Sequence, residues 1–329
     1  ETEEVLCREP EEDLKCSFER IYFAKGNDKD IYTERKEMGI KLAPRILKSI
    51  NNDFKNAVFS WIPNTAETSY FGMVKGLEQI IREDQFKKLF ESGKEVKEED
   101  LKDILSATAR GEKIIQKTAK LRTFITDDTN RDDLVATSYD VTYGQIRRDQ
   151  DTLVLLDDSI VRGTTLKQSI LRIADRLGPK KVVIVSAAPQ IRYPDCYGID
   201  MSKLKDFIAF RAAIHLLHER NMEYVIDEVY DRCKAQQSLP KEECKNYVKQ
   251  IYEPFTDDEI SKKIADLLIP NDMNAEVEII YQTVDDLHEC CPENKGDWYF
   301  TGNFPTNGGN KVVSKSFVNF YEKSDARAY

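Results

Sequence analysis

The chain has 329 residues, of which 40% are hydrophobic and 33% charged, and its formal net charge at pH 7 is −10. This balance supports a sizeable core in one large domain or two smaller ones. It argues against a broad nucleic-acid surface, which needs a basic excess, and no apolar run reaches the length of a membrane span. A phosphorylated small molecule stays possible, because a few local cations and backbone N–H groups suffice to bind one.

Cysteine usage and the first residues bear on the compartment. The seven cysteines are scattered and odd in number, which suits reduced thiols better than a disulfide framework. The opening segment, Glu1 to Glu4, is acidic rather than signal-like. We therefore expect a cytoplasmic protein. The chain begins without Met, which suggests processing or a cut from a longer protein.

The first third of the chain predicts helices and strands in alternation. In order, the expected elements are a strand over 18–24, a helix over 32–50, a buried strand over 57–62, a polar loop over 64–69 and a helix from Tyr70. Pro44 requires a kink or a break in the first of these helices. Residues 83–113 are rich in charge and helical in tendency, which indicates a helical insertion on the surface.

The middle of the chain predicts a βαβ unit. Residues 152–156 form a compact β-type run, and apolar residues then recur at helical spacing from Leu166 to Leu177. Gly178 and the proline after it end this helix, and 181–186 is the next buried strand. Such a unit implies a parallel sheet with helices on its faces, so the expected fold class is α/β.

The last third is predicted to be mainly helical. The helical pattern runs from 203 to about 270, a last strand is expected over 276–282, and an aromatic, Gly-rich tail follows Pro292. We expect three parts, divided as an N-terminal segment 1–15, a core 16–202 with the helical insertion 83–113, and a helical extension with a tail closing on the core, 203–329.

The most informative stretch runs from Leu153 to Thr165. Two carboxylates, Asp157 and Asp158, leave a buried strand at its carboxyl end, where open α/β sheets place ligands. A loop then enters a helix N-terminus, whose free N–H groups favour anions. Gly163 lets the backbone approach a ligand, and hydroxyl donors come from Ser159, Thr164 and Thr165. The alternative is a solvated turn followed by a threonine that merely caps the helix.

This string resembles the phosphoribosyl pyrophosphate motif of the type I phosphoribosyltransferases, and in particular that of the amidophosphoribosyltransferases. Three further stretches resemble the same family in the same order, namely 16–24, 186–200 and 299–306. The resemblance covers Cys16 to about Thr306, with 83–113 and 233–263 looking like insertions. It implies the type I phosphoribosyltransferase fold, a mostly parallel sheet flanked by helices.

The resemblance also implies roles for residues. Asp157 and Asp158 would hold the ribose hydroxyls and the associated magnesium. The residues that would cradle the 5-phosphate are Ser159, Arg162, Gly163, Thr164 and Thr165. Thr65, in a stretch similar to the pyrophosphate loop of the family, would lie near the metal. A shifted alignment would use Thr68 instead, and a plain loop threonine is the other interpretation.

The catalytic loop departs from the family pattern. The segment from Lys117 to Ile125 keeps the Arg-Thr-Phe-Ile end but lacks the Lys-Asn-Arg-Tyr that normally precedes it. We expect Lys117, Lys120 and Arg122 to be catalytic by neutralising pyrophosphate. Solvated surface cations are the alternative.

The expected cofactor is Mg²⁺ alone. Some relatives hold an iron–sulfur cluster through a cysteine at the position of Cys16 and a Cys-x-x-Cys pair near the tail. Here the tail has only the adjacent Cys290 and Cys291, so no iron–sulfur cluster is expected.

The implied reaction is displacement of pyrophosphate from phosphoribosyl pyrophosphate by ammonia, giving 5-phosphoribosylamine in the first step of de novo purine synthesis. The glutaminase domain that supplies ammonia in the family is expected to be missing from this chain, because Cys7 is neither terminal nor in the usual Cys-Gly context. No nucleic-acid or membrane partner is expected, and a homo-oligomer is. The alternatives are a nucleobase phosphoribosyltransferase and a non-catalytic regulator that binds phosphoribosyl pyrophosphate.

Overall fold

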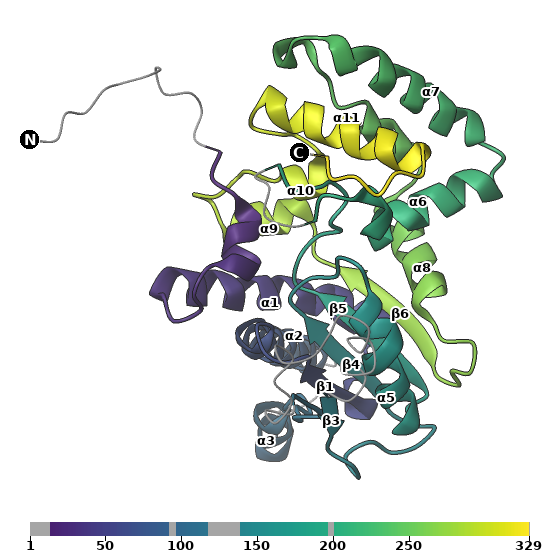
Figure 1. Cartoon of the computed structure of the whole chain (residues 1–329). Helices are drawn as coiled ribbons and strands as arrows, with labels where there is room; N and C mark the ends of the chain where they lie inside the picture. Colours follow the sequence, from purple (N-terminus) through teal and green to yellow (C-terminus); the bar gives the residue numbers. More distant parts are fainter. Residues whose placement is uncertain (1–13, 92–96, 118–138, 197–200, 329) are drawn as a thin grey trace, which may run out of the picture.

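The computed structural model describes residues 14–91, 97–117, 139–196 and 201–328. A parallel sheet lies at the centre (Figure 1). Its four strands in spatial order are β1 (Ala57–Trp61), β4 (Thr152–Asp157), β5 (Lys181–Ser186) and β6 (Glu276–Tyr281). All of their pairings are parallel. The predicted strands over 57–62, 152–156, 181–186 and 276–282 and the predicted α/β class are confirmed.

Helices cover both faces of the sheet because its strands are apolar on both sides. Leu153, Leu155 and Ile184 face one core, which includes residues of the helix after β4 and of the C-terminal helices. Val154 and Val183 face the other core, which is completed by the first two long helices. Successive residues of a strand, such as Leu153 and Val154, therefore face opposite cores, as expected because side chains alternate between the two faces of a sheet.

The predicted strand over 18–24 is wrong. This segment forms the short π-helix η1 (Glu19–Phe23). Phe18 and Ile21 are buried, whereas Tyr22 and Phe23 are exposed by 50% and 39%. Burial that recurs after three residues is helical, whereas the alternation along the sequence had suggested a strand.

The two long helices α1 (Lys29–Ser49) and α2 (Glu67–Glu91) pack against each other. Asp28 caps α1 by accepting from the backbone N–H groups of its first turn. The helix runs through Pro44 without a break. Pro44 lies on the exposed face, where water can satisfy the carbonyl that lacks its N–H donor. The second helix begins three residues before the predicted Tyr70.

Glycines let the backbones of α1 and α2 touch. A Cβ on Gly39 would lie 1.9 Å from the carbonyl oxygen of Ser69, and one on Gly72 would lie 1.8 Å from that of Lys36. Only a residue without a side chain permits this approach. The contact fixes the start of α2 and therefore the loop that joins it to β1.

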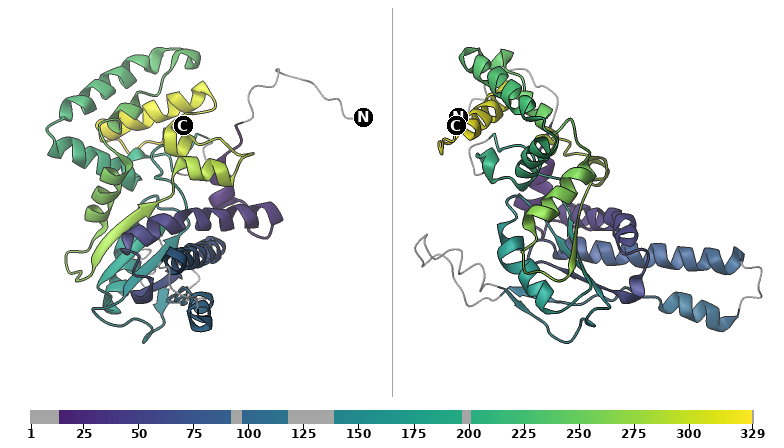
Figure 2. Two further views of the ribbon diagram at one scale, coloured as in Figure 1. Left: turned by 180° about the vertical axis from the view of Figure 1, so that it is seen from behind. Right: turned by 90° about the vertical axis from the view of Figure 1, so that its right-hand side faces the viewer.

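The predicted insertion 83–113 is partly helical. The end of α2 and helix α3 (Glu98–Ser106) extend away from the sheet (Figure 2, right). The chain then returns to the sheet edge, where Phe59 N–H donates to Arg110 O and Glu112 N–H donates to Phe59 O, both over 2.9 Å. An antiparallel pair follows, formed by β2 (Ile115–Lys117) and β3 (Tyr139–Val141).

The predicted helix after β4 is confirmed, and it starts as the π-helix η5 (Leu166–Ile170) before continuing as α5 (Leu171–Arg176). The later helices are α6 (Ile208–Glu219), α7 (Glu223–Ala235), α8 (Asp257–Leu268), α9 (Val284–Cys290), α10 (Trp298–Thr301) and α11 (Asn307–Tyr321). The 3₁₀ turns are η2 (Phe54–Asn56), η6 (Leu204–Asp206), η7 (Gln236–Ser238), η8 (Lys241–Glu243) and η9 (Tyr247–Ile251). Because β6 comes from the segment 203–329, the central sheet spans the boundary predicted at 202. Within the described ranges, no helix has the length and apolar character needed to cross a membrane.

We predict that Gly72→Ala lowers the free energy of unfolding by about 1–3 kcal/mol, because the new methyl group would overlap the Lys36 carbonyl. Gly308→Ala is the matched control. Gly308 lies in the first turn of α11 with only the Thr306 hydroxyl, 3.5 Å away, near its added Cβ. Denaturant unfolding should show a lower midpoint for the first variant only, and equal midpoints would contradict the close contact.

Candidate functional site

A cavity of about 940 Å³ lies at the carboxyl ends of β1 and β4. It brings together nine residues predicted from the sequence, namely Thr65, Lys117, Asp157, Asp158, Ser159, Arg162, Gly163, Thr164 and Thr165. The other two predicted residues, Lys120 and Arg122, lie outside the described residues. The segments that meet here are far apart in sequence but follow neighbouring parallel strands, whose carboxyl ends share one edge of the sheet.

Two adjacent carboxylates form the floor of this cavity. Asp157 is the last residue of β4, and its Oδ1 accepts from the N–H of Asp158 over 3.0 Å. Oδ1 of Asp158 accepts from the N–H of Ser159 over 2.8 Å. Thr65 lies near the Asp158 carboxylate, and its hydroxyl helps to lower the pKa of that group. Thr65 lines the cavity and Thr68 does not, which favours Thr65 of the two threonines considered.

The surroundings of these carboxylates disfavour their charged forms. Burial raises the pKa of Asp157, and the negative charge of Asp158 raises it further. Burial also raises the pKa of Asp158, against hydrogen bonds from Asp157, Ser159 and Thr65 and the positive charge of Arg35. Two half-buried carboxylates side by side are therefore stabilised by any ligand that brings a cation or hydroxyl donors.

The loop from Ser159 to Thr165 is fixed by the elements around it. Gly163 has φ +71°, and a Cβ there would lie 2.6 Å from Leu268 Cδ2, so both backbone and space require glycine. The Val161 carbonyl accepts from the N–H of Ile208, at the start of α6. Thr164 and Thr165 already lie in the first turn of the helix, and the Thr165 side chain makes no capping hydrogen bond. Thr165 is therefore not a simple N-cap residue.

The oxygen ligands of the cavity fit a shared magnesium ion. Among the described residues, no group of three or more His, Cys, Asp or Glu side chains could hold a metal. Mg²⁺ is often bound through one or two carboxylates together with substrate phosphates. The carboxylates of Asp157 and Asp158 and the hydroxyl of Thr65 supply such ligands. They suit a magnesium ion that arrives with a phosphorylated ligand.

An aromatic wall stands on the other side of the cavity, and the sequence did not assign it to the site. It comprises Phe18, Tyr22, Phe23 and Tyr299. The rings of Phe18 and Tyr299 have centroids 5.0 Å apart, and Tyr299 Oη donates to the buried Asp195 over 2.9 Å. The two stretches 16–24 and 299–306, which resemble the family, contain these aromatic residues and could have indicated the wall. The prediction of a strand over 18–24 kept them from being placed at the site.

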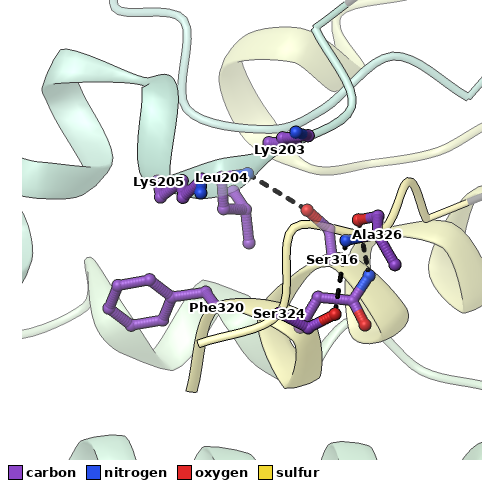
Figure 3. A pocket seen from close by; sticks show the side chains of 8 residues that line it. Lys203, Leu204, Lys205, Ser316, Phe320, Ser324 and Ala326 are labelled. Carbon is purple, nitrogen blue, oxygen red and sulfur yellow. Dashed lines mark hydrogen bonds between the residues drawn. The ribbon is translucent and has the colours of Figure 1, made fainter. Parts of the chain in front are cut away.

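A second hollow lies among the C-terminal residues, outside the described cavity (Figure 3). Its volume is about 10 Å³, room for about one water molecule. The hydrogen bonds beside it, from Leu204 N–H to Ser316 Oγ and from Asn319 Nδ2 to Ala326 O, join the chain around 204 to α11 and the tail. It is a packing feature and is too small for a metabolite.

We predict that Asp157→Asn stabilises the ligand-free protein at neutral pH, because Asn keeps the shape of the side chain without the disfavoured charge. Since the folded-state pKa of Asp157 lies above its unfolded value, the penalty is fully present above the folded pKa. It disappears as pH falls toward the unfolded value of about 4. Unfolding free energies measured against pH should therefore converge for variant and wild type at low pH. A variant that is less stable at neutral pH would contradict this assignment.

Among known proteins, the chain is similar in sequence to amidophosphoribosyltransferases. No protein-family model matches the chain. The amidophosphoribosyltransferase of Lachancea kluyveri is 30% identical over 227 residues, which are 66% of this chain and 38% of that protein. The amidophosphoribosyltransferase of Saccharomyces cerevisiae is 27% identical over 281 residues, 82% of this chain and 49% of that protein. The chain thus spans less than half the length of these curated relatives.

A solved structure supports the same fold. It is described as the allosteric regulatory enzyme of purine biosynthesis, and it matches 89% of this chain and 46% of its own with a TM-score of 0.50 and 20% identity. The family resemblance predicted from the motif is confirmed by the relatives. By its sequence likeness, the chain belongs to the amidophosphoribosyltransferase family.

Proposed function

We propose that the cavity binds phosphoribosyl pyrophosphate with magnesium and that the chain transfers its phosphoribosyl group to ammonia. The products are 5-phosphoribosylamine and pyrophosphate, and the step would be the first of de novo purine synthesis. The observation that carries the proposal is the convergence on one cavity of an acidic pair, a loop that enters a helix N-terminus, and a threonine from the turn after the neighbouring strand. Names of relatives agree with a pentosyl-transferring enzyme.

Each part of the ligand has a matching part of the cavity. The carboxylates of Asp157 and Asp158 would accept hydrogen bonds from the ribose hydroxyls. This role requires carboxylate oxygens that are not already neutralised by an ion pair. The 5-phosphate would lie on the loop of Ser159 to Thr165, where N–H groups and hydroxyls converge at a helix N-terminus. Thr65 would face the pyrophosphate.

The chemistry asks for little covalent help from the protein. The C1–O bond to pyrophosphate breaks, a C1–N bond forms, and the nitrogen loses one proton. Magnesium, when bound, would neutralise part of the charge on the departing pyrophosphate. Lys117, which lines the cavity, is proposed to do the same, together with Lys120 and Arg122. The electron-deficient carbon would be shielded from water by the aromatic wall of Phe18, Tyr22, Phe23 and Tyr299.

The wider setting is also a proposal. We propose ammonia as the direct nitrogen donor for these 329 residues, with glutamine cleaved by a glutaminase domain. A cytoplasmic homo-oligomer, no iron–sulfur cluster and a division of the chain at residue 15 complete the proposal. The part after residue 202 is an extension that also supplies β6 to the central sheet.

Magnesium phosphoribosyl pyrophosphate should stabilise the wild-type fold by about 2.7 kcal/mol at a hundredfold excess over its Kd. Thr165→Val should weaken binding by about 1.5–3 kcal/mol, because it removes a hydroxyl that would bond to a charged phosphate. Thr33→Val, in an exposed turn of α1, is the control and should bind normally. Thermal-shift titration measures all three, and no ligand response from the wild type would reject the binding proposal.

Ammonia should replace glutamine as nitrogen donor. Only unprotonated ammonia has a free lone pair, so pyrophosphate release in ammonium chloride should rise as pH approaches the pKa of ammonium. Parallel assays with glutamine should show no release. Equal rates with both donors would mean that these residues cleave glutamine themselves. Tight ligand binding without release from either donor would favour the non-catalytic regulator.

A further inference from the structure

Arg35 is a charged side chain that the motifs do not explain. It lies in the second turn of α1, and it is only 5% exposed. Burying a guanidinium is costly unless its N–H groups are bonded and its charge is balanced nearby. The partners of Arg35 therefore indicate what its burial achieves.

Its hydrogen bonds hold the short helix η1. Arg35 Nε donates to the carbonyl of Arg20 and Nη2 donates to that of Ala24, each over 2.9 Å. Ala24 is the C-terminal cap of η1, where carbonyls lack donors from the helix itself. Arg35 thus joins α1 to the helix that supplies Tyr22 and Phe23 to the cavity wall.

The charge of Arg35 also helps to hold down the pKa of Asp158, which burial raises. Within the described residues Arg35 forms no ion pair with a carboxylate, although neighbouring Arg20 is paired with Glu34. Burial lowers the pKa of Arg35, and the negative charge of Asp158 opposes this effect more strongly than that of Glu34 does. Away from bulk water such a charge is poorly screened and acts over longer distances.

We propose that Arg35 is a positioning and specificity residue. It holds the helix η1, whose aromatic rings line the same cavity as Asp158, and it brings a fixed positive charge near that carboxylate. This charge offsets part of the field of the two carboxylates. A bare divalent cation is then bound weakly, whereas a cation carried by a phosphorylated, net negative ligand is favoured. The ligand class rests on the function proposed above, but the effect on a bare cation does not.

The test compares two substitutions with a matched control. Arg35→Gln keeps an N–H donor but removes the charge, and Arg35→Lys keeps the charge. Arg45→Met is the control, because Arg45 lies on the same helix and also donates to a backbone carbonyl, that of Tyr281. Binding of Mn²⁺ alone is measured by the electron paramagnetic resonance of free Mn²⁺, and binding of magnesium phosphoribosyl pyrophosphate by calorimetry.

We expect Arg35→Gln to bind Mn²⁺ about three- to tenfold more tightly and the phosphorylated ligand about tenfold more weakly, as loss of one nearby positive charge requires. Arg35→Lys and the control should keep the Mn²⁺ affinity of the wild type. A purely structural role would instead weaken both ligands together. That result, or unchanged Mn²⁺ affinity in a folded Arg35→Gln protein, would overturn the proposal.

Failure of the proposal on Arg35 and failure of the proposed function can be told apart. If Arg35→Gln does not fold by circular dichroism, Arg35→Met serves as the second charge-removing variant. Tighter Mn²⁺ binding by it would support the proposal, and an unchanged affinity would overturn it. If the wild type does not bind phosphoribosyl pyrophosphate, the proposed function fails, while the Mn²⁺ comparison still decides the role of Arg35.

Discussion

Two carboxylates placed side by side at the end of a buried strand are the constraint on which the site depends. Asp157 and Asp158 repel each other and are partly removed from water, so the fold must supply donors around them. It does so from three directions, with the N–H of Ser159, the hydroxyl of Thr65 and the charge of Arg35. A metal ion and ribose hydroxyls would supply further positive charge and hydrogen-bond donors to the two carboxylates.

The supporting groups reach the pair through backbone packing. Thr65 follows β1, whose register against β4 pairs Trp61 with Leu156 and brings the ends of these two strands together. Arg35 comes from α1, whose position relative to α2 is fixed by the contact of Gly72 with Lys36. The packing of α1 therefore affects the cavity directly. A shift of α1 would move both the charge of Arg35 and the aromatic wall, which Arg35 holds through η1.

The sequence predicted the sheet and the grouping of the loop residues 159–165 at its edge well because both rest on local patterns. Apolar runs bounded by Gly and Pro identify buried strands, and the string from Asp157 to Thr165 carries its chemistry in consecutive residues. The segment 18–24 was mispredicted because its residues alternate in the sequence as in a strand, whereas their burial follows a helical period. Arg35 could not be found, since a single arginine in a polar helix becomes significant only when tertiary packing buries it.

The central claim is that one cavity binds both ends of phosphoribosyl pyrophosphate, and a crystal structure with this ligand and magnesium tests it most directly. In that structure the 5-phosphate should lie on the loop of Ser159 to Thr165. The ribose hydroxyls should contact the carboxylates of Asp157 and Asp158, and the pyrophosphate should lie beside Thr65. A ligand whose phosphate lies away from this loop, or whose ribose does not contact either carboxylate, would contradict it.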